Sequence, residues 1–327
     1  MNESSQENII IYDWLSFTTK IHTVEQIKKI IGFAKLTFLE IYGYYGYSKR
    51  ITYEGVSILY DGHSPNMGVL VEMSGQGCRA YETLGTGDWE PLFKLIICGK
   101  SENNMNITRL DIAYDDHEGL FDIQKLYNDT EAGNYISRTR NYEVRKGNKG
   151  QTISHGSKKS SVYIRIYDKA KERGHTDNRH WIRLEIQLRD ENALSFIKND
   201  IEIGSKFRGV VYSYLRYVTP NQADTNKRRW SDADYWQEFV QSSEKISIYE
   251  KPGIDYNELS LEDFVLRNAG NCINVFIKIY GIKNFLRALN VKDKYANYSQ
   301  KLIRLIEKYK DMPNQTPATF AQFKGEI

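Results

Sequence analysis

The stretch Tyr163-Ile164-Arg165-Ile166-Tyr167-Asp168-Lys169-Ala170-Lys171-Glu172 decides how this chain of 327 residues is interpreted. Its isoleucines alternate with polar residues, and successive side chains of a β-strand point to opposite faces, so Arg165, Tyr167 and Lys169 share one face. A phenol has an ordinary pKa of about 10, which makes it a weak nucleophile at neutral pH. Neighbouring cations favour the phenolate and would hold a phosphodiester on the same face. The stretch is therefore either a strand with a solvated outer face or the strand of a nucleophilic tyrosine.

Two further runs, residues 107–115 and 181–188, alternate in the same way. Their apolar residues would enter a core, which leaves charged side chains on the opposite face. The outward residues are Arg109, Asp111, Ala113, Asp115, Trp181, Arg183, Glu185 and Gln187. With the first strand, one sheet face would hold carboxylates, cations and a tyrosine. Taken singly, each carboxylate is explained equally well by a surface ion pair between strands.

This set of side chains is the one that phosphoryl transfer on a nucleic-acid backbone requires. Asp111, Glu185 and Asp115 could supply the oxygen ligands that a hard divalent cation, Mg²⁺ or Mn²⁺, prefers. Such a cation would polarise the scissile phosphate, while arginine and lysine side chains hold its non-bridging oxygens. A tyrosine of this face would attack and become covalently joined to the DNA; Tyr163 and Tyr167 share the face, and alternation alone does not choose between them.

The charge distribution also indicates a polyanionic partner. The formal net charge is only +3, but residues 138–183 contain 13 lysines and arginines against 4 acidic residues. Aromatic residues are interleaved with these cations, and the whole chain has 24 tyrosines. Dense positive charge with aromatic side chains is typical of surfaces that bind nucleic acids, although a basic segment is often only a solvated surface.

The cysteines and the apolar windows predict a cytoplasmic protein that does not enter a membrane. Cys78, Cys98 and Cys272 are widely separated, match no zinc-binding spacing and cannot all pair, which is usual in a reducing compartment. The most apolar window, residues 91–98, is too short to span a bilayer and contains Lys94. No signal peptide is visible at the start of the chain.

The order of expected elements predicts an α+β fold made of two degenerate repeats. Each repeat, about residues 9–100 and 106–219, runs strand, helix and antiparallel meander. In the first repeat a helix is expected over residues 23–42, with Thr23 and Gln26 at the spacing of a capping box. The runs 60–64 and 154–157 look like equivalent turns of the two repeats. Residues 1–219 would form the catalytic domain, and residues 220–327, after a polar linker at Pro220, an α-helical C-terminal region.

Two histidines lie beside a glycine in those turns. His63 and His155 could each ligate a metal ion. A lone histidine in a turn is, however, more often a surface residue or a backbone hydrogen-bond partner. A contribution of His155 to the metal site therefore stays open.

Five ordered motifs resemble the replication initiation factor family, which is found in rolling-circle plasmids, conjugative elements and some phages. They lie at residues 12–17, 74–79, 108–113, 165–169 and 181–185, so the resemblance covers most of residues 10–215. It implies an origin-specific, metal-dependent DNA strand transferase. Such an enzyme nicks one strand, stays joined to the 5′ phosphate through a tyrosine, and leaves a 3′ hydroxyl for a polymerase.

Carried over by position, the resemblance puts the nucleophile on Tyr167, the metal carboxylates on Asp111 and Glu185, and a supporting cation on Lys169. Arg165 joins the catalytic set from its place beside the tyrosine. Arg109, Lys158, Lys159 and Arg183 are expected to contact DNA. His155 and Lys158 depart from the family pattern, in which an aromatic residue and an arginine are common at these positions.

Two other functions are compatible with the same residues. A non-catalytic protein could use the face to stack bases, and a metal-dependent nuclease could cleave with water and form no adduct. The expected partner is the DNA origin of the protein's own element. A host helicase recruited by the C-terminal helices and a second protomer for strand transfer are further hypotheses.

Overall fold

A ten-stranded antiparallel sheet organises the first of two compact units, Met1–Glu250 and Lys251–Ile327. The computed structural model describes residues 8–64, 66–148, 150–177, 179–241 and 270–293. The strands of the large sheet are β1 (Ile9–Thr19), β2 (Leu39–Tyr42), β3 (Tyr47–Tyr53), β4 (Val56–Gly62), β5 (Val69–Met73), β6 (Met105–Asp116), β8 (Tyr142–Gly147), β9 (Gly150–His155), β10 (Val162–Asp168) and β11 (Ile182–Arg189). Two short strands, β7 (Tyr135–Ser137) and β12 (Leu215–Tyr217), form a separate pair.

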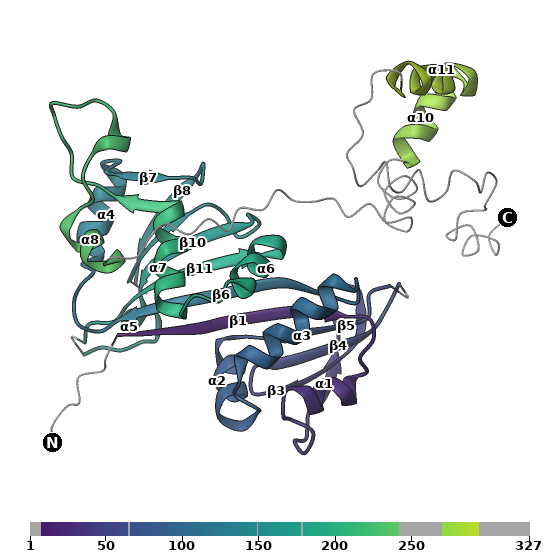
Figure 1. Cartoon of the computed structure of the whole chain (residues 1–327), viewed down its shortest axis with the longest axis horizontal. Coiled ribbons are helices and arrows are strands. Elements are labelled where there is room, and N and C mark those ends of the chain that lie inside the picture. The colour runs from purple at the N-terminus through teal and green to yellow at the C-terminus, as the bar shows by residue number, and fades with distance from the viewer. Residues whose placement is uncertain (1–7, 65, 149, 178, 242–269, 294–327) are drawn as a thin grey trace. The chain divides into compact units, whose positions relative to one another are not determined.

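The order of the strands shows the two repeats. The order is β2-β3-β4-β5-β1-β6-β11-β10-β9-β8, so β1 and β6 are the central pair. On one side of it lie β5, β4, β3 and β2, and on the other lie β11, β10, β9 and β8, in the same sequence of steps. The predicted α+β fold with two related antiparallel units is therefore confirmed, and Figure 1 shows the two halves side by side.

Helices cover one face of this sheet (Figure 1). The helices of the first unit are α1 (Val24–Ile30), α2 (Gly75–Leu84), α3 (Trp89–Ser101), α4 (Ile123–Glu131), α5 (Lys169–Glu172), α6 (Asp190–Lys198), α7 (Ile203–Tyr214), the 3-10 turn η1 (Lys227–Arg229) and α8 (Asp234–Val240). Fully buried strand residues such as Phe17, Ile112 and Leu184 join helix residues such as Ile96 and Val210 in one core. Burial of this apolar surface holds helices and sheet together and leaves the other sheet face for polar side chains.

The helix expected over residues 23–42 is much shorter. Its capping box is present, because Thr23 accepts from the backbone of Gln26 and the Gln26 side chain returns to the backbone of Thr23. The helix ends at Ile30, and Gly32 adopts φ +81°, where a side chain would collide with the backbone of residues 85–86. That left-handed turn reverses the chain, and residues 39–42 then form the edge strand β2.

The equivalence predicted for the two histidine turns is wrong. His63 follows β4, whereas His155 ends β9, whose counterpart in the first half is β3. His155 is fully buried beside Tyr135 and Tyr217, and it lies opposite the core residue Ile164, so it faces the helices. It therefore does not lie on the face that carries Asp111 and Glu185, which argues against the metal role considered for His155.

Burial lowers the pKa of His155 to about 4. The unfolded chain binds a proton near the ordinary value of 6.5, so stability is complete above pH 6.5 and falls as the pH drops from there toward 4. We expect this histidine to account for a loss of about 3 kcal/mol over that window. Urea unfolding at pH 7.5 and 4.5 measures it. His155→Gln should be less stable at neutral pH but should lose that part of the pH slope, whereas His63→Gln, at an exposed position, should keep the slope of the parent. An unchanged slope in His155→Gln would contradict the assignment.

The boundary predicted at Pro220 also moves. Residues after it return to the first unit: Trp236, Phe239 and Val240 of α8 are buried in the main core. The Trp236 ring lies 5.2 Å from that of Tyr217, and Phe239 lies 5.3 Å from Tyr114. The polar linker is therefore an internal loop, and the two units divide near residue 250 instead.

The second unit is helical where it is described. It contains α10 (Gly270–Tyr280) and α11 (Ile282–Asp293), joined at Gly281 and in contact through the rings of Phe276 and Phe285. The helical C-terminal region is thus confirmed for residues 270–293, whereas residues 242–269 and 294–327 of the predicted region lie outside the described residues. Across the described ranges, no helix has both the length and the apolar character needed to span a bilayer.

Candidate active site

The sheet face opposite the helices carries charged side chains at its centre, and we call it the polar face. Strand register places Tyr167 of β10 opposite Arg183 of β11, and Arg183 opposite Asp115 of β6. Two residues further along β11, Glu185 lies opposite Arg165. The polar face is defined by Arg109, Asp111, Asp115, Arg165, Tyr167, Arg183 and Glu185. The structure thus brings together the side chains that strand alternation placed on one face.

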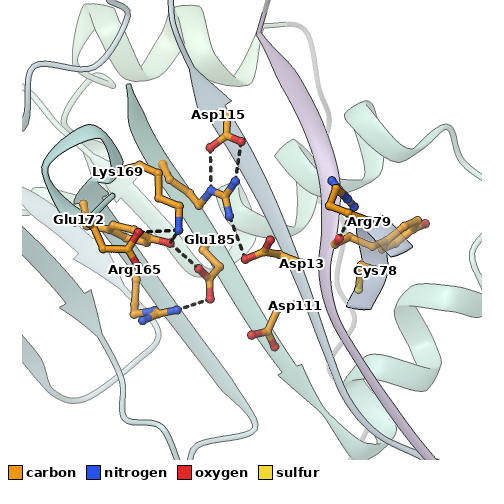
Figure 2. A network of polar contacts seen from close by, with 12 residues as sticks. Asp13, Cys78, Arg79, Asp111, Asp115, Arg165, Lys169, Glu172 and Glu185 are labelled. Atoms are coloured by element: carbon orange, nitrogen blue, oxygen red, sulfur yellow. Dashed lines mark hydrogen bonds and ion pairs between the residues drawn. The ribbon is translucent and has the colours of Figure 1, made fainter. Parts of the chain in front are cut away.

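Tyr167 is 6% exposed and is held by its neighbours on this face. Its hydroxyl donates to Oε2 of Glu185 at 3.0 Å, and Nζ of Lys169 lies 3.5 Å from the same phenol oxygen. The Arg165 guanidinium lies 5.3 Å from the centre of the tyrosine ring. Lys169 begins α5 rather than continuing the strand, and its ammonium also pairs with Glu172 at 2.7 Å. Figure 2 shows the pair of Lys169 with Glu172 and the pair of Arg165 with Glu185.

The neighbouring arginines favour the phenolate of Tyr167, as expected, but they do not determine the direction of its pKa shift. Burial and the negative charge of Glu185 raise the pKa of Tyr167 far above its ordinary value. Arg183 and Arg165 act in the opposite direction but do not compensate. Tyr167 is therefore a protonated phenol whose proton already lies in a hydrogen bond to a carboxylate.

Glu185 is an ionised, buried carboxylate. Burial alone would raise its pKa, but the charges of Arg165 and Arg183 and the hydrogen bonds from Arg165 and Tyr167 hold it below the ordinary value. Oε1 accepts from Arg165 while Oε2 accepts from Tyr167. Each oxygen of Glu185 thus has its own partner, one cationic and one that can give up a proton.

Asp111 is 2% exposed and differs electrostatically from Glu185. Arg109 binds both of its oxygens, with 2.8 Å between Nε and Oδ1, and the Arg109 guanidinium stacks on Trp14 at 4.3 Å. Burial raises the pKa of Asp111, and the charge of Glu185 raises it further against the opposing effect of Arg109. The ionised form of Asp111 is thus disfavoured by burial and by the charge of Glu185, and favoured by its pairing with Arg109.

Arg183 and Asp115 form a buried ion pair with each other. Nε and Nη2 of Arg183 donate to the two oxygens of Asp115 at 2.7 and 2.6 Å, and Nη1 lies 2.9 Å from Oδ2 of Asp13. Asp115 Oδ1 also accepts from the Trp181 indole. Arg183 is 4% exposed and Asp115 is 2% exposed. This geometry argues against the predicted DNA contact of Arg183 and the predicted metal ligation by Asp115, because both groups are buried and satisfied by each other.

Asp13 is a member of the site to which the sequence assigned no role. The pairing of β1 with β6 shifts register between Tyr12 and Trp14, and this bulge turns Asp13 toward Arg183. Burial raises its pKa, an effect that Arg183 opposes. The signal that could have found it is an aspartate in the middle of an apolar strand. Figure 2 shows Asp13, Asp111 and Glu185 as neighbours on the polar face.

The remaining predicted residues lie apart from this centre. Lys158 and Lys159 are exposed in the turn between β9 and β10, at the opposite end of β10 from Tyr167. The carbonyl of Lys158 accepts from Gln187 and Arg189, which fixes the turn on β11. Within the described part of the chain, no three histidine, cysteine, aspartate or glutamate side chains are arranged to hold a metal ion.

Comparison with known proteins matches the two halves of the sheet separately. Residues 9–96 match the model of the rolling circle replication initiation protein N-terminal domain, and residues 105–289 match that of the replication initiation factor. NicK of Bacillus subtilis (strain 168), which is assigned as a DNA relaxase, is 27% identical over 281 residues, 79% of this chain and 78% of NicK. The solved rolling circle replication initiator protein of Geobacillus stearothermophilus is 29% identical, with a TM-score of 0.66, and the match covers 75% of this chain and all of that one.

Proposed function

The chain belongs to the replication initiation factor family of rolling-circle initiators and DNA relaxases, which are DNA-nicking enzymes, and from that premise we propose a mechanism for it. The protein nicks one strand at the origin of its own genetic element and stays joined to the 5′ phosphate through Tyr167. It does so in the cytoplasm of a bacterial host. The observation that supports this most directly is the 3.0 Å hydrogen bond from the buried Tyr167 hydroxyl to Glu185.

Glu185 is the proton acceptor in this proposal. As the Tyr167 oxygen attacks phosphorus, its bond to phosphorus forms, the bond from phosphorus to the 3′ oxygen breaks, and the phenolic proton passes to Glu185. The departing 3′ oxygen takes a proton from solvent. Because the pKa of Tyr167 is raised, a free phenolate would be rare at neutral pH, so a positioned base is needed.

Proton transfer also changes the partner of Arg165. Once Glu185 is neutral, its ion pair with Arg165 loses its charge attraction. Arg165 is partly exposed, with 32% of its side chain accessible, so its guanidinium can turn toward the phosphate. Arg165 and Lys169 would then stabilise the charge on the non-bridging oxygens. Rejoining runs the same steps in reverse with a new 3′ hydroxyl.

Asp111 and Glu185 fit a divalent cation by their chemistry. They are oxygen donors, which Mg²⁺ and Mn²⁺ prefer, and the charge of Glu185 acts on Asp111 on the same sheet face. Asp13 lies on the same face but is paired with Arg183, so Asp111 and Glu185 are the two carboxylates proposed for the cation. A bound cation would neutralise charge on the scissile phosphate and polarise it. Arg109, and farther away Lys158 and Lys159, remain the proposed contacts of the DNA backbone.

The test uses the full chain and single-stranded DNA tiled across its gene and the flanking inverted repeats. With Mg²⁺ or Mn²⁺, one oligonucleotide is expected to be cut at one position, and its 3′ fragment should migrate with the protein on a denaturing gel. Removal of the metal by EDTA should abolish both. Cleavage without an adduct would identify a nuclease that uses water, and binding without cleavage would identify a non-catalytic nucleic-acid-binding protein.

The helicase and the second protomer belong to the same proposal. On α10 and α11, apolar side chains such as Ile279, Ile282 and Leu286 are about half exposed or more, as a surface for a protein partner would be. Alanine at these positions should weaken capture of a host helicase without changing nicking. Undiminished capture would exclude this surface, and a single protomer per adduct in light scattering would exclude the dimer.

A further inference from the structure

Three aromatic rings gather at the end of the sheet where Tyr167 lies. Trp181 immediately precedes β11, and its ring centre lies 5.3 Å from that of His117, at an interplanar angle of 36°. His175 approaches the same indole at 6.2 Å and 41°. All three side chains are partly exposed. We propose that His117, His175 and Trp181, here called the ring shelf, bind an unpaired nucleobase of the DNA next to the scissile phosphate, an inference that rests on the proposed function.

The ring shelf is tied to the catalytic residues by hydrogen bonds. The carbonyl of Trp181 accepts from the backbone of Lys169 at 2.9 Å, and its indole donates to Oδ1 of Asp115 at 2.8 Å. Asp115 in turn holds Arg183, which lies opposite Tyr167 in the strand register. Two residues along a strand and one strand across place the Cα atoms of Trp181 and Tyr167 roughly 8 Å apart. A nucleotide adjoining the phosphate at Tyr167 can therefore reach the shelf.

The charges around the ring shelf fit a base better than a phosphate. The acidic neighbours, Asp115 and Asp116, are buried, and each is paired: Asp115 with Arg183, and Asp116 with His180 at 2.8 Å. Arg183 lies 6.0 Å from the Trp181 ring but is already bound to two carboxylates. What the shelf offers is therefore the faces and edges of rings. Every base has a π-face that stacks on such rings, whatever its sequence.

The indole is also held in a fixed orientation, as a stacking surface requires. Its Nε1 bond to Asp115 and the backbone bonds of its carbonyl fix both ends of the residue. A ring that is already ordered loses little conformational entropy when a base stacks on it. The competing explanation is that the rings only shield the pair of Asp115 and Arg183 from water, and the two explanations differ in what a missing base does.

The experiment tests whether removal of one protein ring and removal of one DNA base affect the same contact. Binding of the cleavable oligonucleotide is measured in EDTA, so that no strand is cut, with a single abasic nucleotide placed in turn at each position around the nick. For the unmodified protein, one abasic position adjoining the nick should weaken binding roughly 5- to 150-fold. Trp181→Ala should bind the intact DNA more weakly by a similar factor. Placing the abasic nucleotide at that position should not weaken its binding further. Trp181→Phe keeps a ring and should retain most of the effect.

Trp230→Ala is the matched control. This tryptophan is also partly exposed, but its indole donates to the carbonyl of Asp224 and lies beside Lys227 of η1. It should show the abasic profile of the parent. The ring shelf would be overturned if the parent and Trp181→Ala lost the same affinity at every abasic position. It would also be overturned if a Trp181→Phe variant with native thermal stability lost the same affinity at all positions. Failure of the parent to form an adduct, with the coupling still present, would instead count against the proposed chemistry alone.

Discussion

Tyr167→Phe is expected to abolish the covalent protein–DNA adduct and to lower nicking by about 10⁴-fold or more, the scale of removing a covalent nucleophile. The substitution removes one oxygen and keeps the ring, which packs against Arg165. Since Tyr167 is buried and its hydroxyl bonds to Glu185, the variant leaves one oxygen of that carboxylate without its phenol partner. Adduct yield on a denaturing gel and single-turnover cleavage rates measure the effect, and binding of the uncut strand should change little.

Tyr163→Phe is the matched variant for this test. Tyr163 lies on the same strand and the same face, is similarly buried at 7%, and sits beside the same arginine at 5.9 Å. Its hydroxyl donates to Ser154 rather than to Glu185. We therefore expect nicking by Tyr163→Phe to stay within a few-fold of the parent. Adduct formation by Tyr167→Phe together with its loss in Tyr163→Phe would transfer the nucleophile to Tyr163.

Strand alternation predicted the face of each site residue but not its partner. Period two placed Asp111, Arg165, Tyr167 and Glu185 together correctly, because all three strands are regular where these residues occur. The two-residue period could not distinguish Asp115 from Asp111, because both lie on the same strand and point to the same face. Only the structure shows that Asp115 is bound by the buried Arg183, whereas Asp111 is bound by the partly exposed Arg109 and is also affected by the charge of Glu185. The odd or even position of a residue in a strand gives the sheet face to which its side chain points, whereas its ion-pair partner depends on the neighbouring strands.

Two features of the site could not be predicted from the two-residue period of the strands. Asp13 enters the site through a β-bulge, and an extra residue in a strand breaks the period on which the prediction relied. The raised pKa of Tyr167 depends on burial, which outweighs two nearby cations once the phenol is removed from water. A sequence shows that cations are close but not how much solvent remains.

The presence of two repeats was predicted correctly, but the equivalence of their turns and the end of the second repeat were not. The mirrored strand order about β1 and β6 bears out two related units. The wrong pairing of His63 with His155 came from matching short turns, which diverge more easily than strand order. The boundary at Pro220 failed for a different reason. A polar linker composition did not reveal that Trp236 and Phe239, beyond it, return to the core.

Glu185→Gln is expected to slow adduct formation by 10²- to 10⁴-fold, the usual range for loss of a general base. The direction of this effect is informative, because the charge of Glu185 raises the pKa of Tyr167. If Glu185 acted only through its charge, its removal would make the phenol easier to ionise, and the variant would nick faster at a given pH. A slower variant therefore requires that the carboxylate accept the proton or hold the cation. Single-turnover rates between about pH 6 and pH 9 measure the difference.

Asp111→Asn separates those two remaining roles. Asp111 does not contact the Tyr167 hydroxyl, and its carboxylate is bound by Arg109. Its loss should raise the Mn²⁺ concentration needed for half-maximal nicking, and excess Mn²⁺ should restore the rate. For Glu185→Gln, excess Mn²⁺ should restore little, because the phenolic proton still lacks its acceptor. Full rescue of both variants by metal would make Glu185 a ligand only, and the proton of Tyr167 would then have to leave by a route that does not use Glu185.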